Sequence, residues 1–138
     1  MVDSNVVLKR ISRIRKCVAT MEGIRRTHSI EQFLKDEIVQ AAAERNIQIA
    51  IQSVLDICNH IVADRKLEVP DEEKHAIQIL ASQKVIPPRL AGALSSMGGV
   101  RNILVREYLE VDHERLYSIM SRNIGDFEKF LAVILKLL

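Results

Sequence analysis

The chain contains no tryptophan, and its aromatic side chains are limited to three phenylalanines and two tyrosines. So few rings argue against a base-stacking platform for single-stranded nucleic acid, because such platforms depend on exposed aromatic faces. The core must instead be built from leucine, isoleucine, valine and alanine. There are only five glycines and three prolines among 138 residues, with 48% hydrophobic and 28% charged residues. This composition indicates one globular, helical domain over residues 1–138.

Cysteines are equally scarce, since Cys17 and Cys58 stand alone without a C-x-x-C pair or ligand-like spacing. Both are expected to be reduced thiols in a helical core. No set of histidine, aspartate and glutamate has metal-ligand spacing, so neither a metal nor another cofactor is expected. The start of the chain lacks the apolar run of a signal peptide, and no stretch approaches the ~18 apolar residues of a membrane span. We therefore expect a cytoplasmic protein with no membrane contact.

Positive charge gathers near the start of the chain, although the formal net charge is only +2. A cluster of this kind could contact phosphates. A solvated helix face is the preferred interpretation, because charge runs usually face water. The cluster comprises Lys9, Arg10, Arg13, Arg15 and Lys16, and Arg25 and Arg26 follow it.

Apolar residues recur at helical spacing along most of the chain. In the first predicted helix they form one stripe, consisting of Val7, Ile11, Ile14, Val18 and Met21. Gly23 can end this helix. Ser29 and Gln32 have the spacing of a capping box. They open a second segment that reaches about Val62, as one long helix or as two with a slight kink.

The second half of the chain is predicted to continue as helices. A polar connection at residues 64–71 precedes a short helix that stops before two prolines. Pro88 fits the first turn of the next helix, which is expected to reach about Glu110. Asp112 is the expected N-cap of a short segment before a C-terminal amphipathic helix. The expected fold is all-α, an antiparallel bundle of four main helices with one or two short ones.

The most informative stretch is 101–108, which reads Arg-Asn-Ile-Leu-Val-Arg-Glu-Tyr. On an ideal helix Arg101 shares an apolar stripe with Tyr108, and its charge there requires a partner or a polar cleft. Asn102 and Arg106 share a neighbouring face. Arg101 and Arg106 point about 140° apart, so both reach one phosphate only with help from a facing surface. A two-fold dimer that apposes two such helices would supply that surface.

Gly98 and Gly99 stand just before this stretch. Each glycine costs about 1 kcal/mol in a helix interior relative to alanine. Close approach of another backbone, from a partner helix or a second subunit, would explain them. The alternative is a simple break between two helices.

The stretch 101–108 resembles the R-x4-H-x-Y signature of the HEPN ribonucleases, and among them it looks like the HepT toxins. This resemblance implies a homodimer with its RNA site at the subunit interface and metal-independent cleavage of RNA, with tRNA as one candidate substrate. It also implies that Arg101 and residue 106 are the catalytic pair and that Asn102 belongs to the same site. The resemblance covers nearly the whole chain, including residues 10–14, 29–34, 59–61, 85–87 and 111–112.

The chain departs from the family signature at one position, where Arg106 replaces histidine. A guanidinium group has no acceptor and a pKa above 12, so it cannot transfer a proton at neutral pH. We therefore expect binding of RNA to be retained and cleavage to be lost or reduced by about 10²–10⁴. Two origins fit this residue, a natural non-catalytic variant or a deliberate substitution that allows a toxic enzyme to be produced. The intact remainder of the signature slightly favours the second.

In HepT toxins the tyrosine of the signature accepts AMP from a nucleotidyltransferase antitoxin of the MNT type. The resemblance therefore implies such a partner for this chain and makes Tyr108 the modification site. An attached nucleotide would place negative charge and bulk beside Arg101 and block RNA.

Two other functions are compatible with the sequence. One is a non-catalytic RNA- or nucleotide-binding dimer that serves as partner of the nucleotidyltransferase. The other is a purely structural subunit of that complex. His113 is not expected to act in place of the missing motif histidine, because a helix break is predicted before Asp112. His28, His60 and His75 lack matched partners and are expected at the surface or at the edge of the core.

Overall fold

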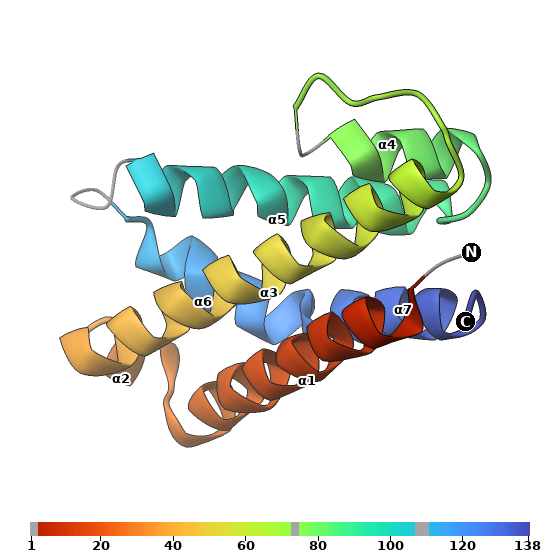
Figure 1. Ribbon diagram of the computed structural model, residues 1–138. Helices are drawn as coiled ribbons and strands as arrows, with labels where there is room; N and C mark the ends of the chain where they lie inside the picture. Colours follow the sequence, from red (N-terminus) through yellow and green to blue (C-terminus); the bar gives the residue numbers. More distant parts are fainter. Residues whose placement is uncertain (1–2, 73–74, 107–110) are drawn as a thin grey trace.

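The computed structural model describes residues 3–72, 75–106 and 111–138, except for the side chains of residues 101–106. The described residues form helices and no strand (Figure 1). The long helices run alternately in opposite directions, and α6 and α7 together form the fourth arm of the bundle. This confirms the predicted all-α antiparallel bundle. The helices are α1 (Ser4–Thr27), α2 (Ile30–Phe33), α3 (Glu37–Asp64), α4 (His75–Ser82), α5 (Pro88–Arg106), α6 (His113–Arg122) and α7 (Ile124–Leu135).

Helix α1 buries the predicted apolar stripe. Asp3 caps its start by accepting from the backbone N–H groups of Asn5 and Val6. The prediction that Gly23 ends the helix is wrong, because α1 continues for one more turn to Thr27. The Thr27 hydroxyl donates to the Gly23 carbonyl at 2.7 Å. A glycine weakens a helix interior by only about 1 kcal/mol, which packing of the long helix can offset.

Of the two alternatives for the second predicted segment, the structure has two helices rather than one long helix, and a break separates them in place of a slight kink. The capping box is confirmed, with Ser29 Oγ accepting from the Gln32 backbone at 3.2 Å and Gln32 Oε1 accepting from the Ser29 backbone at 2.8 Å. However, α2 lasts only one turn, and Asp36 caps a new helix by accepting from the Val39 backbone at 3.1 Å. Gln40 donates to the Phe33 carbonyl at 2.9 Å across the break. The described residues therefore include three short helices, α2, α4 and α6, where one or two were expected.

Two helices are followed by a lysine at the C-terminal position where glycine is the usual residue. Lys66 after α3 and Lys84 after α4 have φ values of 54° and 59°. In both places the next backbone N–H turns back to the helix, from Leu67 to the Val62 carbonyl and from Val85 to the Leu80 carbonyl. These bonds satisfy carbonyl groups that the helix end leaves without partners. The left-handed backbone at these lysines is a local cost that these bonds offset.

The core joins the first helix to the last. Helix α1 packs along α3, while α7 packs against both α1 and α5. The three phenylalanines are fully buried in a core that is otherwise mostly aliphatic. None of the helices in the described part of the chain is long and apolar enough to cross a membrane.

Asp112 caps α6 as predicted, with its carboxylate accepting from the Arg115 backbone N–H at 3.0 Å. Replacing Asp112 by alanine is expected to lower the free energy of unfolding by about 1 kcal/mol, because a helix N–H loses its partner. Urea unfolding measures the loss as a lower midpoint with an unchanged slope. Asp112→Ser, which keeps a capping oxygen, is the matched control and should lie close to the unmodified chain. An equal loss in both variants would show that the cap is not the cause.

Candidate active site

The motif residues lie on the C-terminal part of α5 and just beyond it. The backbone of Arg101, Asn102 and Arg106 belongs to the last turns of α5, as predicted. Their side chains lie outside the described residues, as does Tyr108 with the rest of 107–110. The predicted extension of the helix to Glu110 is likewise outside them.

The helix that carries the motif is held by its apolar face. This face packs on α3, α4 and α7. Its spacing of three and four residues is that of one helical stripe, which by helical geometry continues at position 101. The motif therefore follows directly from a stretch of helix anchored in the core. The buried side chains are Leu90, Ala91, Leu94, Met97 and Val100.

Gly98 and Gly99 lie inside a continuous helix, so the alternative of a break between two helices is wrong. A Cβ atom added at either glycine would meet no described heavy atom within 4 Å. Close packing against a described part of the same chain therefore does not explain the pair. Close approach by a second subunit stays a prediction.

The first turn of α6 brings together two side chains that the sequence did not connect. His113 Nε2 lies 3.1 Å from Glu44 Oε1 on α3. Both side chains are about three-quarters buried, with exposed fractions of 27% and 24%. The ring of His113 meets Phe33 edge-on at 6.3 Å between centroids. Because 69 residues separate the partners, spacing along the chain could not have predicted this pair.

Two further histidines have partners, which corrects the expectation that they have none. His28 Nδ1 lies 3.2 Å from the Ile24 carbonyl, and its Nε2 lies 4.0 Å from an Asp36 carboxylate oxygen. His60 Nε2 accepts from the Asp3 backbone N–H at 3.2 Å, which ties the start of α1 to α3. These contacts are structural, since they hold helix ends.

The two cysteines are buried free thiols, as predicted. Burial raises the pKa of the Cys58 thiol well above its usual range. Burial also raises the pKa of the Cys17 thiol, although Arg13 and Lys16 oppose this shift. Because the thiolate is the nucleophilic form, neither cysteine is suited to covalent chemistry. Among residues 3–72, 75–100 and 111–138, no three His, Cys, Asp or Glu side chains gather as a metal site would require.

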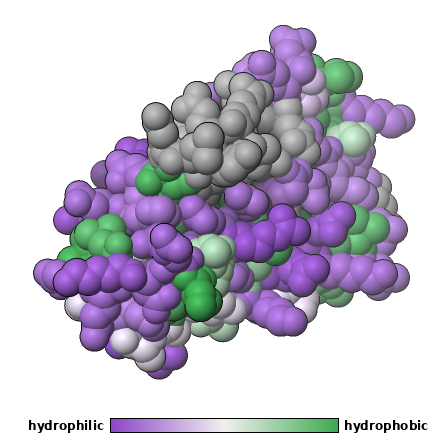
Figure 2. Space-filling model, turned by 90° about the vertical axis from the view of Figure 1, so that its left-hand side faces the viewer, coloured by the Kyte–Doolittle hydropathy of each residue, from purple (hydrophilic) through white to green (hydrophobic). Residues whose placement is uncertain are grey.

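Figure 2 shows the end of the bundle where α2 and the first turn of α6 lie. The described surface here is largely hydrophilic, with apolar residues in separate patches. Exposed apolar side chains of α2 and the residues after it are Ile30, Leu34 and Ile38. The described part of this end is therefore a polar surface with isolated apolar side chains.

The predicted basic cluster is divided between different surfaces. Arg10 and Arg13 line a groove between α1 and α3, and the Arg10 Nε atom lies 3.2 Å from the Asp56 carboxylate. Arg15 lines a separate cavity beside α7. Lys9 and Lys16 are exposed. All five residues of the cluster are exposed, so the preferred interpretation as solvated side chains on the helix is confirmed.

Comparison with known proteins places the chain among RNA-cleaving relatives. Residues 8–134 match the family described as Ribonuclease HepT-like. The chain is 28% identical to the mRNA nuclease HepT of Shewanella oneidensis, over 95% of this chain and 97% of the relative. It is also 28% identical to the tRNA nuclease HepT of Aphanizomenon flos-aquae, over 77% of this chain and 72% of the relative.

A solved structure has the same fold. It is the tri-AMPylated HEPN toxin of Shewanella oneidensis in complex with an MNT antitoxin. The TM-score is 0.88 at 28% identity, and the match covers 97% of this chain and 98% of the other. The arrangement of helices is therefore shared over nearly the full length of both chains.

Proposed function

Because the chain belongs to the HepT-like ribonuclease family, we propose that it is the toxin half of a toxin–antitoxin pair. In this proposal it is a homodimeric, metal-independent endoribonuclease that a nucleotidyltransferase antitoxin silences. The observation that carries the proposal is the match of residues 8–134 to the family, together with a continuous α5 that holds the motif backbone. The relatives are named for mRNA and for tRNA, so RNA is the substrate class.

Cleavage without a metal requires a base for the attacking 2′-hydroxyl, an acid for the leaving oxygen and cations for the charge that develops on phosphorus. Arg101 supplies a permanent charge and a fork that matches two phosphate oxygens. Asn102 orients the phosphate or residue 106. The exposed Gly99 before them is proposed to leave room for a second subunit's helix, which brings a second copy of the motif to the same cleft.

Arg106 changes the balance between binding and chemistry. It adds a cation where the family has a proton-transfer group, so the RNA phosphate is held while no base or acid is supplied. The chain as given is therefore proposed to bind RNA and to cleave it slowly or not at all.

The experiment that tests the proposal is electrophoresis of total cellular RNA after incubation with this chain and with its Arg106→His variant. RNA cut by the variant, with cutting abolished when Arg101→Ala is added, supports the ribonuclease. Intact RNA with the Arg106→His variant would overturn it and select the second candidate, a non-catalytic RNA- or nucleotide-binding dimer. The basic groove between α1 and α3 is the observation that favours this second candidate.

Tyr108 is the proposed site of silencing. The Tyr108 phenol oxygen bonds to the α-phosphorus of ATP, pyrophosphate leaves and the phenolic proton passes to a base or to water. With an MNT-type nucleotidyltransferase and ATP labelled at the α-phosphate, label is expected in this chain and absent from Tyr108→Phe. Tyr117→Phe is the matched control, because Tyr117 is the other tyrosine and its hydroxyl already donates to the His28 carbonyl at 2.7 Å. Label retained in the Tyr108→Phe variant would show that a residue other than Tyr108 is modified.

A further inference from the structure

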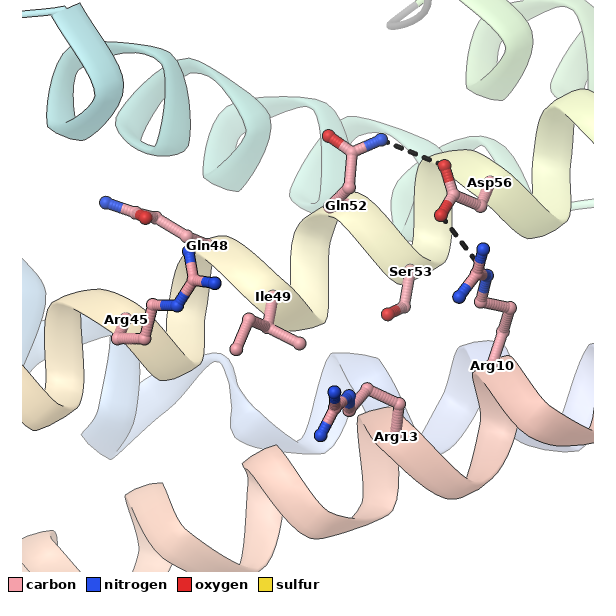
Figure 3. A pocket seen from close by; sticks show the side chains of 8 residues that line it. All are labelled: Arg10, Arg13, Arg45, Gln48, Ile49, Gln52, Ser53 and Asp56. Carbon is pink, nitrogen blue, oxygen red and sulfur yellow. Dashed lines mark hydrogen bonds and ion pairs between the residues drawn. The ribbon is translucent and has the colours of Figure 1, made fainter.

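A groove between α1 and α3 has the features of a second site for an anion. Its volume is about 300 Å³. The described lining residues all belong to these two helices, and most are polar or charged (Figure 3). They are Arg10, Arg13, Arg45, Gln48, Ile49, Gln52, Ser53 and Asp56.

Positive charge exceeds negative charge in this groove. Asp56 is the only acidic residue among the described lining residues, and it pairs with Arg10 at 3.2 Å and accepts from the Gln52 amide at 2.9 Å. Arg13 and Arg45 make no ion pair with any residue that the structure describes. The guanidinium groups of these two arginines therefore remain available for an anion from outside.

Ser53 adds a hydroxyl group to the donors of the groove. The residue is only 4% exposed, yet its hydroxyl makes no hydrogen bond within the described part of the chain. Figure 3 shows this hydroxyl directed from α3 into the space between the helices. No buried side-chain oxygen or nitrogen in the described part of the chain lacks a hydrogen-bond partner, so this hydroxyl is open to the groove rather than sealed in the core. The groove thus presents a hydroxyl that no described residue occupies and that an entering ligand can bind.

The hydrogen-bond donors of the groove indicate the class of ligand that it binds. Two guanidinium forks, a hydroxyl and the Gln48 amide are donors suited to the oxygens of a phosphodiester. Ile49 is the only apolar residue among the described lining residues, so an acidic peptide would gain little from burying its side chains. We propose that this groove between α1 and α3 binds the phosphate backbone of an RNA strand. The choice of RNA rests on the proposed function.

Binding of a fluorescently labelled single-stranded RNA of mixed sequence, followed by anisotropy, tests the proposal. The double variant Arg13→Ala with Arg45→Ala is expected to bind RNA about tenfold more weakly, and affinity should fall less steeply with salt because fewer counterions are released. Arg25→Ala with Arg26→Ala is the matched control. It removes the same charge from exposed positions in the last turn of α1, outside the groove. Equal losses of RNA affinity in both double variants would show that only the net charge of the protein matters, and would overturn the proposal.

Ser53→Ala separates a ligand contact from a structural role. RNA affinity should fall about three- to tenfold, as expected for one lost hydrogen bond. The urea midpoint should stay the same or rise, because the hydroxyl has no partner in the described fold. Unchanged affinity, or a loss of affinity accompanied by a lower midpoint, would overturn the assignment of this hydroxyl to a ligand.

Two further outcomes separate this proposal from the ribonuclease itself. If Arg106→His cuts RNA but the groove variants bind RNA as tightly as the unmodified chain, the groove proposal fails and the ribonuclease stands. If binding depends on the groove while Arg106→His leaves RNA intact, the groove stands and the ribonuclease fails. Displacement of the RNA by poly-glutamate at equal charge concentration would assign the groove to an acidic protein segment and overturn the proposal.

Discussion

Replacing Arg106 by histidine is expected to raise the rate of RNA cleavage by about 10²–10⁴, the usual contribution of general acid–base catalysis. Both side chains can sit beside a phosphate, but only imidazole exchanges a proton near neutral pH. Single-turnover cleavage of a defined RNA, with the protein in excess, measures the chemical step. The mRNA and tRNA named for the relatives are the two substrates to compare.

The pH profile distinguishes restored proton transfer from a change in binding. Cleavage by the Arg106→His variant should depend on pH around the imidazole pKa, roughly 6.5 in the absence of perturbation. Any residual cleavage by the unmodified chain should show no step in that range, because arginine stays charged throughout. Arg106→Lys is the matched control, since it keeps a cation without imidazole chemistry. A comparable gain with lysine would rule out proton transfer as the cause.

Replacing Phe33 by alanine is expected to lower the free energy of unfolding by about 3–5 kcal/mol, the range for a large buried ring. Phe33 is fully buried although α2 is a single turn. Its ring packs 5.4 Å from that of Tyr117 and 6.3 Å from that of His113, so it joins α2 to α6. A loss of this size is a large share of the roughly 5–15 kcal/mol that stabilises a domain.

The urea midpoint of Phe33→Ala measures this loss, with Ile38→Ala as the matched control. Ile38 lies five residues further on and is 83% exposed, so its truncation should change stability by about 0.5 kcal/mol or less. Similar losses in the two variants would contradict the role of Phe33 as the anchor of this end of the bundle.

The features that were predicted correctly from the sequence depend on residues that lie close together in the chain. The stripe from Val7 to Met21, the Ser29 capping box and the Asp112 cap each depend on residues a few positions apart, and all three are confirmed. Errors arose where one local signal competed with another. Gly23 is a typical helix end, but the packing of α1 on α3 extends the helix past it.

The features that the sequence could not predict join residues that are far apart in the chain. Glu44 and His113 meet only because α3 and α6 pack together. The groove likewise requires Arg13 of α1 to face Ser53 of α3. One signal was present in the sequence, since Arg45, Gln52 and Asp56 recur at helical spacing and form a polar stripe on a largely apolar helix. The roles of Arg101, Asn102, Arg106 and Tyr108 stay predictions, because their side chains lie outside the described residues.

The packing of α7 against α1 has a consequence for synthesis of the protein. Ribosomes add roughly 5–20 residues per second, and α1 leaves the ribosome well before α7 has been made. Until then, the side of α1 that α7 covers has no partner, and Phe127, Phe130 and Ile134 are missing from the core. Helices α1 and α3 can pair early because they are close in the chain. The complete bundle, and with it a firmly held α5, forms only after α7 has been made, so a nascent chain that does not yet include α7 lacks a finished site.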